Sequence, residues 1–380
     1  MGKAPIYLDN AATTRVDPRV VQEMLPWLSE RFGNPASSSH AYGREARAAV
    51  EQARAEVAAL VGAEPAEIIW TSGATESNNL AIKGLALAAR SRGRHLVTLQ
   101  TEHKAVLDTM HELERQGCQA TMLAPRSDGL LDLEAFAAAL RPDTVLASVM
   151  LVNNEIGVIQ GIDAIGSICR ARGIIFHVDA AQATGKVAID LRRSPVDLMS
   201  FTAHKTYGPK GIGALYVSSK SQVPLEAQMH GGGHEQGLRS GTLATHQIVG
   251  MGASFRIAGE EMASEVPRMR ALRDRLYDGL AALEGVQVNG DMEQRIAHNL
   301  NISLLLPKAE QVIESLSEIA VSQAAACIAG GAPSHVLQAL GRAGDGAGNS
   351  IRITVGRFNT AVEIDYALAC LRAKIEACGK

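Results

Sequence analysis

The chain has 380 residues, 46% of them hydrophobic, with 37 basic and 40 acidic side chains and a formal net charge of −3. This balance excludes a largely disordered chain, and it lacks the basic excess typical of nucleic-acid-binding proteins. At about 150 residues per domain, the length predicts two or three domains.

The sequence shows no feature of a membrane or secreted protein. It contains no run of about 18 uncharged apolar residues, and Asp9 lies where a signal peptide would need an apolar segment. The five cysteines are an odd number, widely spread and without a CxxC pair. We therefore expect a cytoplasmic protein without disulfides and without a metal site.

Strand-like and helical segments alternate through the first 220 residues, which favours a mostly parallel sheet with helices on both faces. We assign residues 15–255 to this large domain. Apolar runs predict strands at 6–8, 68–70, 95–99, 144–150, 174–178, 198–202 and 212–217, and helical spacing predicts helices at 44–61, from 76 onward, and at 105–116, 133–140 and 162–172.

The pattern changes after residue 244. A long helical stretch at 245–283 is followed by a predicted strand at 298–305 and a final helix at 361–377. We expect a smaller α+β domain formed by residues 1–14 and 256–380.

Polar clusters directly follow several predicted strands, where the ligands of such sheets bind. Asp179 and Lys205 each come at the end of one strand. A lysine with a lowered pKa forms a Schiff base, and a carboxylate keeps a pyridine nitrogen protonated, so the pair is typical of pyridoxal phosphate enzymes. A buried Asp–Lys pair can also be purely structural.

A second feature is the turn at residues 72–75, which precedes a predicted helix. The free amide groups of a helix N-terminus favour a phosphate, although an ordinary N-cap at Thr75 gives the same pattern. Neither GxGxxG nor GxxxxGK[ST] occurs, so the sequence does not support a dinucleotide or P-loop site.

The chain as a whole resembles the IscS/NifS-type cysteine desulfurases of the class-V aminotransferase family. The segments that carry the resemblance are 7–14, 33–35 with 39–40, 71–79, 102–103, 153–157, 179–182, 203–211, 239–242 and 350–352.

The resemblance implies fold type I of the pyridoxal phosphate enzymes, with a mostly parallel seven-stranded sheet, and a homodimer. Lys205 would hold the cofactor covalently, Asp179 would pair with its pyridine nitrogen, and Gln182 would bond its ring hydroxyl. His103 would stack on the ring and move protons.

The remaining site residues are implied in the same way. The other cofactor-binding residues would be Ala74, Thr75, Asn154, Thr202 and His204, with Thr242 reaching in from the partner subunit. The substrate-binding residues would be Asn154, Arg352 and Asn34.

In that family a cysteine thiolate takes the sulfur atom as a persulfide, and the matching residue is Cys327. It could also be a transient ligand of an iron–sulfur cluster, or simply a small buried residue. The residues before it, 323–326, are Gln-Ala-Ala-Ala rather than the usual Ser-Gly-Ser-Ala, so we expect that Cys327 needs a movement to react. This departure suggests the branch typified by DndA, which supplies sulfur for DNA phosphorothioation.

The expected partners are L-cysteine, a second subunit and a sulfur acceptor or iron–sulfur protein, with no direct contact to nucleic acid or membrane. One alternative is another fold type I enzyme, such as a selenocysteine lyase or an aminotransferase. Another is a non-catalytic sulfur carrier or scaffold, which would lack the absorption band of the bound cofactor.

Overall fold

A seven-stranded sheet organises the larger part of the molecule in the computed structural model, which describes residues 4–323, 334–342 and 348–378. Its strands pair in the order β2-β8-β7-β6-β5-β3-β4, and only β8 runs antiparallel to its neighbours. The strands are β2 (Ile68–Thr71), β3 (His95–Leu99), β4 (Gln119–Leu123), β5 (Thr144–Ser148), β6 (Ile175–Asp179), β7 (Leu198–Thr202) and β8 (Gly213–Val217).

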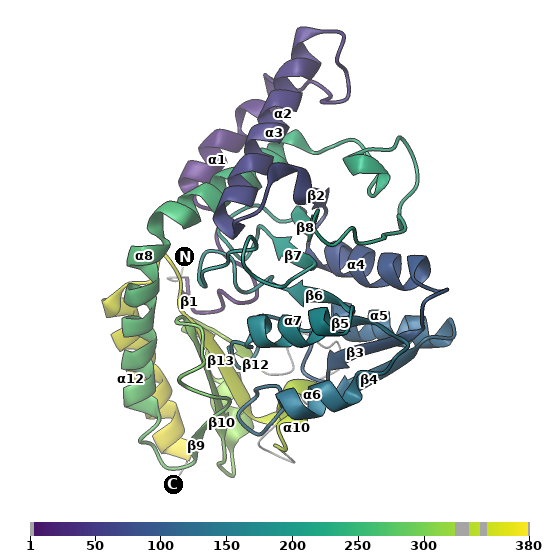
Figure 1. The fold of residues 1–380 in the computed structure, drawn as a ribbon. Coiled ribbons are helices and arrows are strands. Elements are labelled where there is room, and N and C mark those ends of the chain that lie inside the picture. Colours follow the sequence, from purple (N-terminus) through teal and green to yellow (C-terminus); the bar gives the residue numbers. More distant parts are fainter. Residues whose placement is uncertain (1–3, 324–333, 343–347, 379–380) are drawn as a thin grey trace.

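Helices cover both faces of this sheet (Figure 1), because its strands are apolar on both sides. Leu96 of β3 packs in one cluster with side chains of α4 and α5, whereas its neighbour Val97 packs in another with side chains of α3, α6, α7 and the first half of α8. The helices are α3 (Ala41–Val61), α4 (Ala74–Ala88), α5 (Lys104–Arg115), α6 (Leu133–Ala139), α7 (Ile162–Ala171) and α8 (Thr245–Leu280), while α1 (Pro18–Met24) and α2 (Pro26–Ser29) precede them.

A second, antiparallel sheet with the strand order β12-β13-β10-β9 forms the smaller part. Its core combines the second half of α8 with α12 and the buried side chain of Leu8. The elements are β9 (Val286–Val288), β10 (Asn299–Leu304), β12 (Ser322–Gln323), β13 (Ser350–Thr354), α9 (Ala309–Glu314), α10 (His335–Ala339) and α12 (Ala361–Cys378), with the two-stranded pair β1 (Ile6–Tyr7) and β11 (Ile319–Ala320) beside them.

The helix α8 belongs to both parts of the molecule and runs along one side of it (Figure 1). Phe255 packs in the core of the seven-stranded sheet, whereas Met269 and Leu276 pack in the core of the smaller sheet. The division of the chain near residue 255, which stays a prediction, would thus fall inside a continuous helix.

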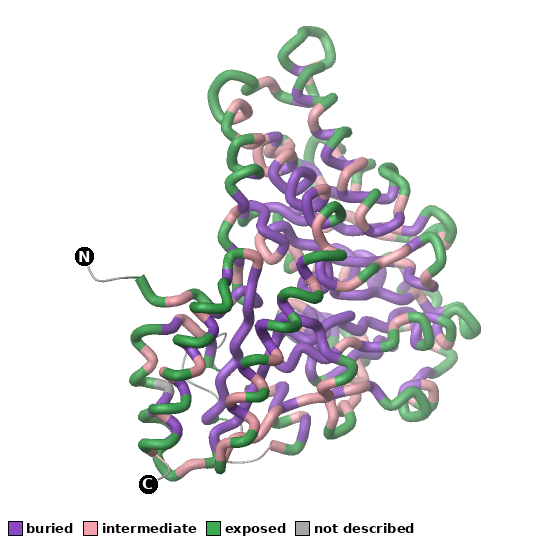
Figure 2. The backbone as a smooth tube through the Cα atoms, turned by 90° about the vertical axis from the view of Figure 1, so that its left-hand side faces the viewer, coloured by how far each residue is buried: buried purple, intermediate pink, exposed green. Residues whose placement is uncertain are grey.

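Burial follows the two sheets, whose strands are mostly buried while the outer helices and turns are exposed (Figure 2). Strands β4, β9 and β13 were not expected from the sequence. β4 is a half-exposed edge strand, and β13 alternates polar and apolar residues, so neither forms an apolar run. Within the described residues, no helix has the length and apolar character needed to cross a bilayer.

Candidate active site

A cavity of about 540 Å³ lies at the carboxyl ends of the parallel strands, between the two sheets. Each polar cluster that follows a predicted strand contributes to its wall, as expected for an open α/β sheet. The lining side chains include Ala74, Thr75, Asn78, His103, Asn154, Asp179, Gln182, Thr202, His204, Lys205 and Arg352.

Asp179 is the last residue of β6 and is buried. One carboxylate oxygen accepts a hydrogen bond from the Asn78 side-chain amide at 2.7 Å, and the other accepts from the Ala181 backbone amide at 2.9 Å. These two donors fix the orientation of the carboxylate, so that it can pair with a positively charged ring nitrogen in the cavity.

His103 follows β3 and caps the N-terminus of α5, where its Nδ1 accepts a hydrogen bond from the Ala105 backbone amide at 3.1 Å. Burial lowers the pKa of the imidazole below its ordinary value of 6.5, and the nearby Lys205 adds to this shift. A neutral ring that accepts at Nδ1 carries its proton on Nε2, so His103 can exchange a proton only at Nε2.

Lys205 lies in the turn that follows β7. Its backbone carbonyl accepts a hydrogen bond from the side-chain Nζ of Lys186 at 2.6 Å. In the same turn, the hydroxyl of Thr206 lies 2.7 Å from the hydroxyl of Thr184. The turn of Lys205 is therefore joined to the turn that follows Asp179.

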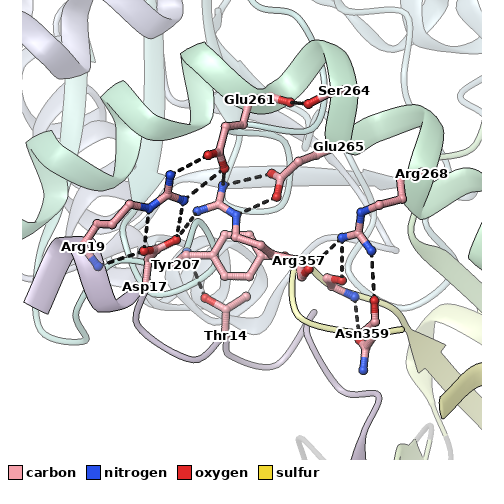
Figure 3. Close-up of polar contacts among 11 residues, drawn as sticks. Thr14, Asp17, Arg19, Tyr207, Glu261, Ser264, Glu265, Arg268, Arg357 and Asn359 are labelled. Carbon is pink, nitrogen blue, oxygen red and sulfur yellow. Dashed lines mark hydrogen bonds and ion pairs between the residues drawn. The ribbon is translucent and has the colours of Figure 1, made fainter. Parts of the chain in front are cut away.

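Tyr207 follows Lys205 in the same turn, and Figure 3 shows the contacts of Tyr207. It has φ +60, a backbone conformation that costs energy for a residue with a side chain. Its backbone amide donates to Thr14 Oγ1 at 2.9 Å, and its hydroxyl accepts from the Arg357 amide at 2.7 Å. The Arg357 guanidinium lies 4.3 Å from the centre of the ring.

Arg357 in turn forms buried ion pairs with two carboxylates (Figure 3), Asp17 at 2.8 Å and Glu265 at 2.6 Å. Asp17 precedes α1, Glu265 belongs to α8, and Arg357 follows β13. The lysine turn is thus anchored to segments from both ends of the chain and to the long helix.

The N-terminus of α4 lines the cavity. Gly73 has φ +152, which favours glycine, and a Cβ atom at Gly213 would lie 2.6 Å from the Gly73 Cα. The first amides of the helix have no intrahelical acceptor and are available to an anion. His204 lies in the same cavity as an uncharged ring, because burial and the nearby Lys205 lower its pKa to about 4.

Arg352 of β13 lies at the opposite wall. Its guanidinium donates to Asp9 Oδ1 at 2.8 Å, to the Asn154 carbonyl at 2.8 Å and to Ser322 Oγ at 2.9 Å. The Nε atom is buried and has no hydrogen-bond partner among the described residues. Arg352 therefore keeps one donor for a ligand even while it pairs with Asp9.

Three other residues of the cavity wall also have a buried polar atom without a partner in the described part of the chain. These atoms are Asn78 Oδ1, Asn154 Oδ1 and Gln182 Oε1. Buried polar atoms are nearly always hydrogen-bonded in folded proteins, so such a group around one cavity indicates a polar ligand.

Two of the predicted site residues, Asn34 and Thr242, do not line this cavity. Asn34 is exposed and its side-chain oxygen accepts from the Ala36 amide at 2.9 Å, and Thr242 is exposed in the loop before α8. Cys327 lies outside the described residues. The positions of Thr242 and Asn34 leave their predicted roles to be tested in an assembled dimer.

The sequence analysis missed Asn78, Lys186 and Glu102. Asn78 could have been found, because it lies one helical turn after the predicted phosphate loop. Glu102 is fully buried and accepts from the Met150 amide at 2.8 Å. Burial and the nearby Asp179 raise the pKa of its carboxyl well above the ordinary value.

The sequence matches the family Aminotransferase class-V over residues 6–367. It is 65% identical over 375 residues to "Cysteine desulfurase IscS" of Methylobacillus flagellatus, which covers 98% of this chain and 93% of the relative. The structure of a "NIFS-LIKE PROTEIN" superposes with a TM-score of 0.90 at 37% identity, over 98% of this chain and 99% of the other.

The structure of DndA from Streptomyces lividans is also similar, with a TM-score of 0.80 and 42% identity over 92% of this chain and 99% of the other. The identity to the relative named IscS is thus considerably higher. The full-length match and the fold together confirm the expected family and its fold type I architecture. The chain belongs to the class-V aminotransferase family and, within it, to the cysteine desulfurases of the IscS and NifS type.

Proposed function

We propose that the chain converts L-cysteine into L-alanine with pyridoxal 5′-phosphate as its cofactor and passes the sulfur atom to its own Cys327. The observation that carries this proposal is a single cavity that combines Lys205, the fixed carboxylate of Asp179 and four buried polar atoms without partners among the described residues. A carboxylate and an amine at neighbouring strand ends match the two ends of a pyridoxal group.

The residues present fit this cofactor. Asp179 would hold the pyridine nitrogen, Gln182 the ring hydroxyl through its buried and unpaired Oε1, and His103 would lie on the ring face. Its phosphate would lie at the N-terminus of α4, against Ala74, Thr75, Thr202 and His204. When bound, the group supplies an electron sink for negative charge at the substrate α-carbon.

The substrate carboxylate would bind Arg352, with Asn154 beside it. The buried Nε atom of Arg352, which has no partner among the described residues, supports this role, because a charged N–H donor binds a carboxylate oxygen strongly. The Lys205 Nζ would take the α-proton of cysteine. His103 would exchange protons only at Nε2, because Nδ1 is engaged at the start of α5.

The sulfur transfer is assigned to Cys327 by the resemblance alone. Its thiolate would attack the substrate sulfur, the carbon–sulfur bond would break, and the electron pair and a proton would remain with alanine. The sum is balanced: cysteine and one enzyme thiol give alanine and one enzyme persulfide. The thiolate is the reactive form, as in other cysteine nucleophiles.

We further propose a homodimer in which Thr242 of each subunit completes the phosphate site of the other. The acceptor of the sulfur would be an iron–sulfur assembly protein, which the higher identity to a relative named IscS favours over DNA phosphorothioation. A reducing cytoplasm is the expected compartment, because none of the four described cysteines forms a disulfide.

Mass spectrometry of the protein after exposure to ³⁴S-labelled cysteine tests the proposal. We expect the additional sulfur on Cys327, with equal amounts of alanine and, after addition of a reductant, sulfide. C327S should keep the cofactor absorption and release no sulfide, while C378S serves as the matched control and stays active. An unlabelled Cys327, or wild-type turnover by C327S, would refute its role.

The same assay separates the alternatives. A transaminase or a selenocysteine lyase would not form alanine and sulfide together from cysteine, and a non-catalytic carrier would show no cofactor absorption. Borohydride reduction followed by peptide mapping should place the cofactor on Lys205.

A further inference from the structure

We infer that Lys186 is a positioning residue for Lys205, because its side chain fixes the backbone of the lysine turn and its ammonium form opposes a second positive charge on Lys205. This inference rests on the proposed function, in which Lys205 carries the cofactor. It concerns a residue that does not line the cavity in the described structure and lies behind it.

The first support is the position of Lys186 between the two turns that must hold the cofactor. Lys186 ends the turn that begins at Asp179, and its Nζ donates to the backbone carbonyl of Lys205 at 2.6 Å. The hydroxyls of Thr184 and Thr206 form a second link at 2.7 Å. The turn that follows Asp179 and the turn that contains Lys205 are therefore joined by two short contacts.

The second support is the tight packing of this turn. Gly185 has φ +71, and a Cβ atom there would lie 2.8 Å from the Cβ of Ala258 in α8 and 3.1 Å from the Cγ2 of Thr206. The turn cannot shift away from Lys205, because α8 closes its other side. The ammonium of Lys186 is consequently held in one place rather than free to reach solvent.

The third support is burial. Lys186 is only 6% exposed and has no directly paired carboxylate in the described part of the chain, which is rare for a lysine. Burial lowers the pKa of its amine to about 7, and the nearby Lys205 and Arg357 add to the shift, whereas Glu265 opposes it. Burying the amine of Lys186 lowers the stability of the fold because the amine loses its hydration, and a methionine would fill the same space without this loss.

Lys186 is surrounded by charged and titratable groups from several elements. They are Lys205 in the turn after β7, Glu265 of α8 and Arg357 after β13, together with His204 and His298, whose pKa values are lowered in part by Lys186. Both histidines are uncharged at neutral pH. Glu265 is engaged by Arg357 at 2.6 Å, so it does not cancel the effect of Lys186 on Lys205.

The test uses the complete holoprotein and two substitutions, K186M and K186Q. Both remove the charge, and only the glutamine keeps a donor. We expect kcat of K186M to fall about tenfold with little change in KM, because the loss of a hydrogen bond from a charged donor raises the activation free energy by an amount of that order. The kcat of K186Q should fall less, because glutamine keeps a donor. In both, the pH midpoint of the visible cofactor band should rise by about one unit, because a cation that opposes protonation is gone.

T184V is the matched control, because it removes the contact between the Thr184 and Thr206 hydroxyls and changes no charge. Its midpoint should equal that of the wild type. The inference would be overturned if the pH midpoint of the cofactor band were unchanged in K186M and K186Q, or if T184V shifted it equally. If K186M does not fold, K186Q alone decides the test. Failure of the proposed function is distinguishable, since the wild-type protein would then show no cofactor on Lys205.

Discussion

The two walls of the cavity are built in different ways. On the wall of the seven-stranded sheet, the contacts that fix Lys205 come from residues about twenty positions away, such as Lys186 and Thr184. On the wall of the smaller sheet, Arg352 depends on Asp9 and Asn154, which are 343 and 198 positions away. The Lys205 backbone is thus tied to the neighbouring strand end, although Tyr207 of the same turn also contacts the distant Thr14 and Arg357. The ion pair of Arg352 with Asp9 forms only when both ends of the chain have met.

The sharpest way to break the cofactor side is K205A. We expect kcat to fall about 10³-fold or more, because the variant loses both the covalent anchor and the base. The fold should remain, since the neighbouring contacts use the backbone of this residue. Steady-state alanine formation measures the loss and circular dichroism the fold. Residual activity near that of the wild type would contradict the assignment.

R357M tests the joint between the two walls. The substitution leaves the buried Glu265 without its ion-pair partner, while Asp17 keeps its pair with Arg19 at 2.8 Å. Removing one partner of a buried ion pair costs up to about 3–5 kcal/mol. Urea unfolding of the apoprotein measures the change, and R357K is the control that keeps the charge without the planar geometry. A loss below about 1 kcal/mol would show that the network does not stabilise the fold.

R352M addresses the substrate side alone. We expect about a 100-fold loss of kcat/KM for cysteine, mostly through KM, because a charged donor to a carboxylate is removed. The cofactor absorption should be unchanged. D9N is the useful comparison, since it removes the ion pair and leaves the guanidinium in place. Equal KM values in R352M and the wild type would exclude this role for Arg352.

The contrast between the walls also explains what sequence reasoning reached. The buried strands β3, β5, β6 and β7 are short apolar runs that end at polar clusters, so the cofactor side followed from the sequence. Arg352 was reached only through the resemblance, because nothing near it in the chain marks it as part of the cavity. The cluster around Arg357 was missed, since its partners come from three distant segments.

Glu155 provides the smallest expected effect. Burial raises the pKa of its carboxyl to about 7, although Ser334 and Arg352 oppose the shift. A raised folded pKa adds stability that is complete below about pH 4.5 and is lost as the pH rises through 7. The stability of the wild type relative to E155Q should therefore fall by 1–2 kcal/mol, as an order of magnitude, between pH 5 and 7.5. Urea unfolding at both pH values measures this difference. An equal difference in unfolding free energy between the wild type and E155Q at pH 5 and at pH 7.5 would contradict the prediction.

The long helix α8 has a consequence for how the protein unfolds. It spans 36 residues, and Phe255 and Leu276 on this one rod serve two separate apolar clusters. If either cluster unfolded, half of α8 would lose its packing partners, and an isolated helix of that length is only marginally stable in water. Denaturation should accordingly occur as one cooperative event, with calorimetric and van't Hoff enthalpies in agreement.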